Sequence, residues 1–364
     1  MRNTIILLIT VLASLNVVFA QKTNDLIEDI FVKKTTIGGY GELHYNQSML
    51  DGGKTKKTLD FHRFVLFFSH SWNEKWSFKS EVEIEHNFVE SGQGELAIEQ
   101  AYLNFRVSEK FGIRAGVILN PVGIINEIHE PPTFLSVERP EYSKYIIPTT
   151  WFGNGAAIFG NISGFDYVFT AMEGLNGNKL TPTNIQASAI RKGRQEGFKS
   201  NAKSILLTAR LNYTRINGIK FGGSFSFNNA IAEAGNIQIG LSEFHFEMNK
   251  YNVIVVGEIA NIAYGNNSIN NSFGYYVDLG YDLSKIIGVG SSLVPFVRYT
   301  DYNTASSTKT GGDSEKEFHK TKWMVGVSFK PIDEVVLKVD YAERKTKLSS
   351  KTSQLLNFGI GYMF

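Results

Sequence analysis

Alternation with a period of two is the feature of this sequence that most restricts its fold. Between Trp76 and His86, the apolar residues tryptophan, phenylalanine, valine and isoleucine alternate with one lysine and three glutamates. Successive side chains on a strand point to opposite faces, so this segment has one apolar and one charged face. A helix would mix the two kinds around its circumference. The segment therefore predicts an amphipathic strand.

The same alternation recurs along the chain and predicts about sixteen strands. The predicted windows are 35–45, 59–71, 76–86, 96–107, 111–118, 155–162, 165–172, 204–214, 218–227, 238–248, 251–262, 271–283, 293–302, 320–330, 335–343 and 353–364. In two windows, 59–71 and 238–248, the alternation of apolar and polar residues shifts by one position, which indicates a β-bulge.

The connections between these strands alternate in length. The longer polar ones are 46–58, 87–95, 119–154, 173–203, 228–237, 263–270, 303–319 and 344–352. Short periplasmic turns that alternate with long external loops are typical of outer-membrane barrels. The alternative is a soluble β-sandwich, which alternates in the same way but buries its apolar face.

Three features favour the barrel. Aromatic residues near strand ends are candidates for interfacial girdles: Trp72, Trp76, Trp323, Tyr213, Tyr251 and Tyr281. Many strands carry charges on the other face, which a packed core would not tolerate unpaired. The last strand carries Phe358, Ile360, Tyr362 and Phe364 in phase, and it resembles the assembly signal of bacterial outer-membrane barrels. We predict an all-β, transmembrane antiparallel barrel over residues 35–364 in the outer membrane of a Gram-negative bacterium.

The N-terminal segment has the layout of an export signal. Residues 1–20 contain a basic Arg2, a short apolar run and the small residue Ala20 at a predicted cleavage site. Residues 21–34 would then form a periplasmic leader. An uncleaved helical anchor is the alternative, but the apolar run is short for a span of about 20 residues.

Charge and cysteine content exclude several classes of function. The 37 basic and 35 acidic residues nearly cancel, so no whole-chain charge favours nucleic acid. The absence of cysteine excludes disulfides, thiolate metal sites and cysteine nucleophiles. Seven histidines occur in no recognisable nucleophile or zinc motif, so we expect neither an enzyme nor a cofactor.

Sixteen strands enclose an aqueous channel rather than a packed interior. The inward-facing charged residues are therefore candidates for the pore wall: Arg63, Lys79, Glu81, Glu83, Glu85, Arg106, Arg114, Arg210, Arg298, Lys322, Lys338 and Asp340. The ladder Glu81, Glu83 and Glu85 has two interpretations. Its carboxylates could hold a divalent cation, but pairing with basic neighbours is favoured and no metal site is predicted.

Segment 119–154 is the third external loop, which we predict to fold inward into the barrel, and it is long enough to suggest a function. Its apolar residues need a surface to pack on. Its charged residues are candidates for a pore constriction: Glu127, Glu130, Glu138, Arg139, Glu141 and Lys144. The alternative is an external lid. The next loop, 173–203, has a basic excess that could attract anions, bind lipopolysaccharide or simply be solvated.

Four stretches resemble the phosphate-selective porin O and P family. They are Arg63 to Glu85, Glu99-Gln-Ala-Tyr-Leu-Asn-Phe105, Arg114-Ala-Gly-Val-Ile-Leu-Asn-Pro-Val-Gly123 and Phe134-Leu-Ser-Val-Glu-Arg-Pro140. The match covers roughly residues 60–160, and Val122 stands where the family usually has phenylalanine. The resemblance implies a sixteen-stranded, trimeric outer-membrane channel.

The strand pattern and the inward-facing charges predict a porin for passive diffusion of small hydrophilic solutes or ions. The resemblance implies that anions such as phosphate are among them. Its expected partners are outer-membrane lipid, lipopolysaccharide, the barrel assembly machinery and two further copies of the chain. The alternatives are a non-conducting barrel that acts as an adhesin or structural protein and, less favoured, a barrel enzyme.

Overall fold

The computed structural model describes residues 33–364 except 51, 91–92 and 289. The predicted signal peptide 1–20 and nearly all of the leader 21–34 lie outside the described residues. Sixteen strands follow in chain order: β1 Lys34–Leu50, β2 Thr55–Ser71, β3 Trp76–Glu90, β4 Gln93–Ser108, β5 Phe111–Leu119, β6 Phe152–Ile162, β7 Phe165–Glu173, β8 Ile205–Tyr213, β9 Ile219–Ala230, β10 Ile237–Lys250, β11 Val253–Gly265, β12 Ile269–Tyr281, β13 Ser292–Thr308, β14 His319–Ile332, β15 Val335–Thr346 and β16 Ser349–Met363.

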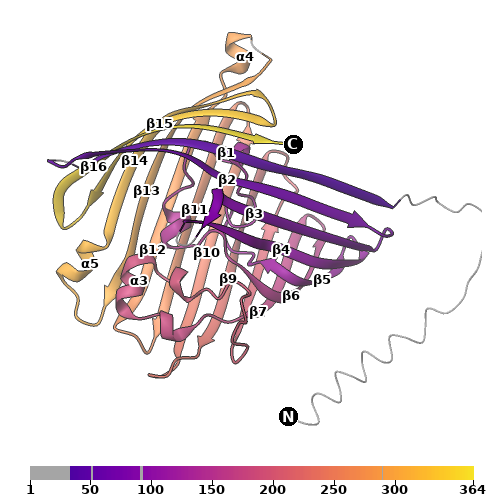
Figure 1. Ribbon diagram of the computed structural model, residues 1–364, viewed down its shortest axis with the longest axis horizontal. Coiled ribbons are helices and arrows are strands. Elements are labelled where there is room, and N and C mark those ends of the chain that lie inside the picture. Colours follow the sequence, from indigo (N-terminus) through magenta and orange to yellow (C-terminus); the bar gives the residue numbers. More distant parts are fainter. Residues whose placement is uncertain (1–32, 51, 91–92, 289) are drawn as a thin grey trace, which may run out of the picture. The chain divides into compact units, whose positions relative to one another are not determined.

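Each strand pairs antiparallel with its neighbours in the chain, and β16 pairs with β1, so the sheet closes into a barrel (Figure 1). The closure extends to Phe364, whose backbone N–H and C=O both bond Gly39. The predicted barrel and its sixteen strands are confirmed. Most strands are longer than predicted because ladder pairing continues through the polar residues at the loop ends.

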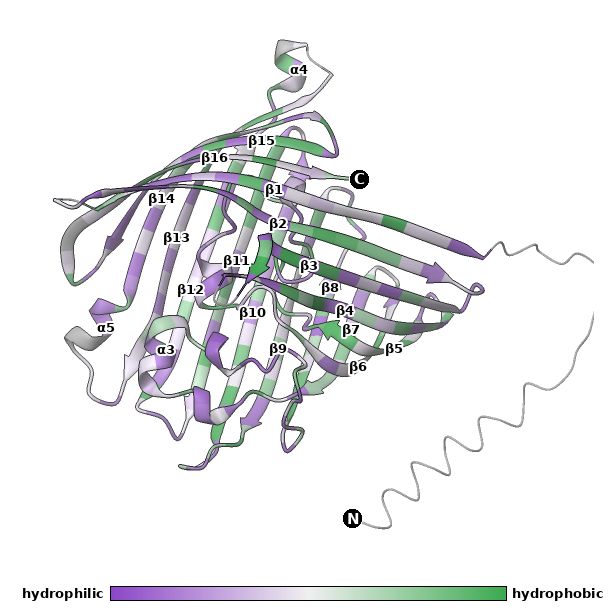
Figure 2. Cartoon of the chain, viewed as in Figure 1, coloured by the Kyte–Doolittle hydropathy of each residue, from purple (hydrophilic) through white to green (hydrophobic). Residues whose placement is uncertain are grey.

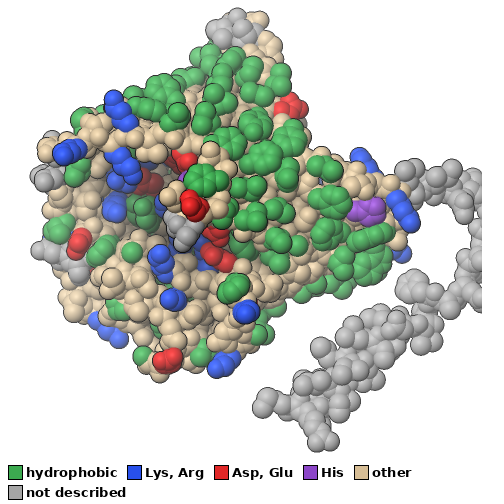
Figure 3. Space-filling view, viewed as in Figure 1, with side chains coloured by type: hydrophobic (Ala, Val, Ile, Leu, Met, Phe, Trp, Pro, Cys, Tyr) green, Lys and Arg blue, Asp and Glu red, His purple; other side chains and the backbone are tan. Residues whose placement is uncertain are grey.

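The apolar faces of the strands point outward. Phe225, Phe244 and Val325 are about half exposed, whereas their strand neighbours of opposite parity are buried or face the lumen. Figure 2 shows the alternation along single strands, and Figure 3 shows hydrophobic side chains spread over the outer surface. This arrangement turns the apolar face to lipid and the polar face inward.

Two bulges change which side chains face inward. In β2 the register skips His62, so Asp60 and Arg63 both face the lumen. In β4 the register skips Glu99, which is buried together with its neighbour Gln100. The bulge predicted in 59–71 is confirmed. The one predicted in 238–248 is wrong, because β10 pairs with both neighbours in unbroken register.

The connections contain the remaining elements. These are the short helices η1 Pro131–Thr133, α2 Tyr142–Tyr145, η2 Gly177–Lys179, α3 Pro182–Ser188, η3 Arg191–Gly193, α4 Ser284–Ile287 and α5 Asp313–Glu317. Several loops predicted to be long are short, as at 347–348, because the strands extend into them. Among the described residues, 120–151 and 174–204 are the longest segments between strands. In the described part of the chain, no helix has the length and apolar character needed to span a membrane.

Candidate pore constriction

The long segment between β5 and β6, residues 120–151, is closed at its base by Asn126. The Asn126 amide donates to the carbonyls of Asn120 and Trp151, and its oxygen accepts from the Trp151 N–H at 2.6 Å. Both ends of the segment are thereby held together where β5 and β6 meet. This segment corresponds to the predicted third external loop. Because it comes first of the two long segments between strands, we call residues 120–151 the first loop.

The first loop contacts inward-facing side chains on the opposite wall of the barrel. Asp340 on β15 accepts the Val137 N–H at 2.7 Å. Lys338 Nζ donates to the Pro131 and Ser136 carbonyls at 2.7 and 2.8 Å, and Arg298 on β13 donates to the Ser136 hydroxyl. These wall residues are buried, so the loop covers them.

Two glycines make this close approach possible. A Cβ on Gly361 of β16 would lie 2.3 Å from the Cβ of Pro131. Gly123 has φ +72°, a conformation that favours glycine, and a Cβ there would meet the carboxylate of Glu258. Larger residues at these positions would push the first loop away from the wall.

A second loop, residues 174–204, packs against the inner face of β10 to β13. Its buried Leu180, Ile185 and Ile190 lie in one apolar cluster with wall residues of these strands. Arg191 donates to the Thr149 carbonyl at 2.5 Å, and Arg194 donates to that of Thr150. Two of the basic residues expected on an external or solvated loop therefore join the two loops to each other.

A cavity of about 370 Å³ lies between the first loop and the inner wall. Its wall residues come from β1, β2, β3, β14, β15 and β16, and Arg191 of the second loop completes it. Six basic and four acidic side chains line it: Arg63, Arg139, Lys144, Arg191, Lys322, Arg344, Glu83, Glu85, Glu138 and Glu141. Figure 3 shows charged side chains gathered around the hollow on this face.

Both loop carboxylates in the cavity are paired. Glu141 accepts from Lys322 Nζ and Arg344 Nη1, each at 3.3 Å, and from the Tyr302 hydroxyl at 3.2 Å. Burial raises the pKa of Glu141, but these two cations outweigh it, and the pKa is lowered. Burial likewise opposes ionisation of Glu138, but the hydrogen bond from His44 outweighs it and lowers the pKa of Glu138 to about 2. Both carboxylates are therefore ionised at neutral pH.

Three of the cavity's basic side chains make no ion pair among the described residues: Arg139, Lys144 and Arg191. Nε and Nη2 of Arg139 are buried and have no hydrogen-bond partner in the described structure. Lys144 lies over the Tyr145 ring, 5.8 Å from its centroid, and Arg191 donates to a backbone carbonyl. These cations can therefore interact with an anion in the cavity.

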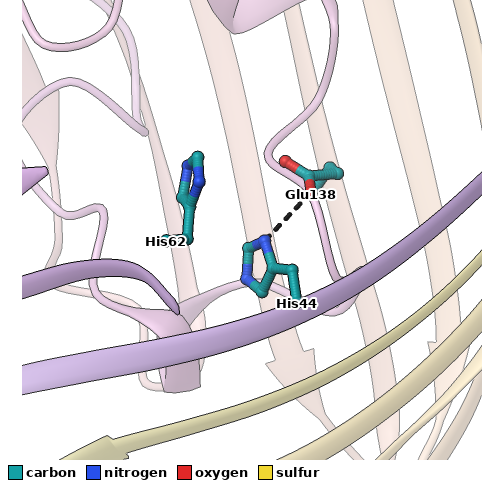
Figure 4. A group of neighbouring side chains, drawn as sticks. All are labelled: His44, His62 and Glu138. Carbon is teal, nitrogen blue, oxygen red and sulfur yellow. Dashed lines mark hydrogen bonds and ion pairs between the residues drawn. The ribbon is translucent and has the colours of Figure 1, made fainter. Parts of the chain in front are cut away.

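Two histidines and Glu138 meet at the cavity (Figure 4). Both ring nitrogens of His44 are used: Nδ1 with Glu138 at 2.9 Å and Nε2 with Glu42 at 3.1 Å. The His44 and His62 rings stack at 4.9 Å with planes 18° apart. Their in-plane lone pairs run nearly parallel and do not converge on one ion. This group is a hydrogen-bonded part of the pore wall.

A different group lies at His129 of the first loop. Nε2 of His129 is 3.6 Å from Glu81 Oε1 and 3.4 Å from Glu99 Oε2, and all three side chains are at most 2% exposed. Burial lowers the pKa of His129, but the two facing carboxylates outweigh it and raise the pKa to about 10. The cluster fixes the loop to β3 and β4.

The predicted constriction residues divide into two sets. Glu138, Arg139, Glu141 and Lys144 line the cavity, whereas Glu127 and Glu130 do not. Glu127 pairs with Arg210 on β8, and one carboxylate oxygen of Glu130 is buried without a hydrogen bond among the described residues.

The predicted wall residues are also divided. Arg63, Glu83, Glu85 and Lys322 line the cavity. Arg298, Lys338 and Asp340 are buried beneath the first loop, so they are not the solvated wall that their parity suggested. Glu81 faces His129, Lys79 lies over the Phe67 ring, and Arg106 and Arg114 lie over the Phe159 ring.

Sequence reasoning missed His62, Glu99, His129 and Arg191 as members of these groups. For Glu99 the sequence held a signal. Strict alternation would put its carboxylate on the apolar face of the strand, and a β-bulge at this position avoids that. The roles of the others depend on loop contacts that strand periodicity does not encode.

The comparisons with known proteins agree with this architecture. The sequence model of the phosphate-selective porin O and P family matches residues 37–235. An uncharacterized protein of Aquifex aeolicus is 34% identical over 356 residues, which cover 91% of this chain and 80% of that protein.

Two solved structures show the same fold at low identity. An anion-selective porin from Comamonas acidovorans superposes with a TM-score of 0.62 at 10% identity, covering 92% of this chain and 100% of the porin. In-vitro folded OmpT of Vibrio cholerae, described as the trimer form, gives 0.60 at 12% identity, covering 91% of this chain and 99% of OmpT.

Proposed function

Because the chain belongs to the phosphate-selective porin O and P family, we propose that it lets small hydrophilic solutes diffuse passively through its barrel. The protein is an outer-membrane β-barrel channel, and the family places it among channels rather than barrel enzymes. The observation that carries the proposal is the charged cavity of about 370 Å³ between the first loop and the wall. A solute in the lumen passes a polar, ionised surface, which sets a size limit and a charge filter.

We further propose a modest preference for anions. The cavity has two more basic than acidic side chains, and its loop acids Glu138 and Glu141 already have basic partners. Arg139, Lys144 and Arg191 supply the unbalanced charge. Inorganic phosphate is the probe that tests this preference, because it is a multiply charged anion to which lysine and arginine side chains donate charge-assisted hydrogen bonds.

Single-channel recording of the full chain in a planar bilayer tests both proposals. We expect discrete conductance steps, a reversal potential of anionic sign in a salt gradient, and reduced chloride current on adding phosphate. The variant Arg139→Gln should shift the reversal potential toward cations, whereas Lys79→Gln, outside the cavity, should change it less. A barrel that inserts without conducting would contradict the channel and favour an adhesin or structural barrel.

The assembly is proposed to be a homotrimer. The support is that the similar barrel of Vibrio cholerae OmpT is described as a trimer form, and that large apolar side chains on the outer face are available for contact. Native mass spectrometry of the detergent-extracted protein tests it. Binding of lipopolysaccharide and recognition of the Phe358 to Phe364 signal by the assembly machinery remain predictions.

A further inference from the structure

We propose that Glu81, Glu99 and His129 form a binding site for a divalent transition metal, represented by Zn²⁺, which fixes the first loop to the barrel wall. The three side chains come from β3, from the bulge of β4 and from the first loop. The proposal does not depend on what passes through the channel.

The spacing of the three donor atoms is the first argument. Nε2 of His129 is 3.6 Å from Glu81 Oε1 and 3.4 Å from Glu99 Oε2. These separations exceed ordinary N–H···O hydrogen bonds, which are about 2.7–3.2 Å long. Ligands at about 2.0–2.2 Å from a tetrahedral Zn²⁺ lie roughly 3.4 Å apart. The two distances from His129 therefore match the edges of such a site, and all three donor atoms lie within 4.8 Å of one another.

The second argument is that two of the three donor atoms, one on His129 and one on Glu99, are buried without a hydrogen-bond partner among the described residues. Neither ring nitrogen of His129 has one among the described residues, and neither has Glu99 Oε2. Buried polar atoms in native proteins are rarely left without a partner, and an ion is one explanation when they are. Imidazole together with carboxylate oxygens is a donor set that suits zinc.

The other oxygen of each carboxylate is held in place. Gln100 donates to Glu81 Oε2 at 2.5 Å, and the Thr150 hydroxyl donates to Glu99 Oε1 at 2.5 Å. This leaves Glu81 Oε1 and Glu99 Oε2 directed toward His129. Such supporting hydrogen bonds orient the ligands of protein metal sites.

Charge balance also favours a dication. A protonated His129 is the competing occupant, and it would leave one negative charge in excess between two buried carboxylates. Arg63, which lies 3.7 Å from Glu83 on the same strand as Glu81, is already paired with Glu42. A dication with a neutral imidazole would balance both carboxylates. Thr150, whose hydroxyl donates to Glu99, also lines the pore cavity, so the cluster lies next to that cavity.

The test is zinc binding by the full-length barrel in detergent. After treatment with a chelator and dialysis, we expect one Zn²⁺ per chain by isothermal titration and elemental analysis. His129→Gln and Glu99→Gln should each weaken binding at least tenfold, whereas His62→Gln, in the stacked pair of the cavity, should not change it. The absorption-edge spectrum of bound zinc should show a nitrogen and oxygen shell at about 2.0 Å.

A second measurement keeps the proposal testable if one variant folds poorly. In the wild-type protein, saturating Zn²⁺ should slow proteolysis within residues 120–151, and the chelator should reverse this effect. Absence of stoichiometric zinc binding by the folded wild-type barrel would overturn the proposal. So would binding that persists in both His129→Gln and Glu99→Gln but is lost in His62→Gln.

Discussion

The attachment of the first loop through Glu141 leads to a quantitative prediction. In Glu141→Gln, the side chain keeps its volume and one acceptor oxygen for Tyr302, but it loses the charge that pairs with Lys322 and Arg344. The Lys322 side chain is only 7% exposed, so its ammonium stays buried without a counterion. Breaking a buried ion pair costs about 3–5 kcal/mol.

The expected cost here is smaller. Arg344 is 32% exposed and can be solvated, and glutamine still accepts hydrogen bonds, so we expect about 2–3 kcal/mol. Since about 1.4 kcal/mol corresponds to a factor of ten, local opening should become roughly 30- to 140-fold more frequent. The amides of Tyr145 and Ile146, which bond the Glu141 and Tyr142 carbonyls, report that opening.

Hydrogen exchange measured by mass spectrometry on peptides covering 141–147 is the assay. Glu127→Gln is the matched control, because it also breaks a loop-to-wall ion pair but lies outside the cavity. We expect faster exchange at 145–146 only in Glu141→Gln, together with a reversal potential shifted toward anions. Exchange and reversal potential both unchanged in Glu141→Gln would refute the assigned role of this residue.

Three further predictions concern the loop and the wall. The pKa of Glu138 is about 2 in the folded protein, against an ordinary value near 4.3, so ionised Glu138 stabilises the fold fully above about pH 5 and progressively less as the pH falls toward 2. The thermal unfolding temperature of the wild type should therefore approach that of Glu138→Gln only near pH 2. Equal unfolding temperatures already at pH 5 would contradict the stabilising role of Glu138. Arg298→Met should destabilise the barrel by about 3–5 kcal/mol in denaturant titration, because it leaves buried Asp278 unpaired, and Asp278→Asn in the same background should recover part of the loss. Gly361→Ala should cost about 1–3 kcal/mol and raise conductance by displacing Pro131, whereas Gly240→Ala, where an added Cβ meets nothing within 4 Å, should do neither.

Periodicity was sufficient for much of the fold because strand parity is a local property. Each strand needs one face for lipid, so the positions of Phe225 or Val325 can be assigned from their immediate neighbours. The number of strands, the closed barrel and the bulge in 59–71 followed from this rule. The false bulge in 238–248 came from the same rule, because polar residues near a strand end weaken the parity without breaking the ladder.

Tertiary structure decided which inward-facing residues meet one another. Asp340 bonds the Val137 N–H although 203 positions separate them, and no local pattern encodes that contact. The bulge that turns Glu99 inward, and the loop that brings His129 to it, join residues of three segments in one cluster. By itself the sequence determined a lipid-facing barrel, because that depends on alternation along single strands. The lining of its cavity depends on where two long loops pack, and only the folded chain decides that.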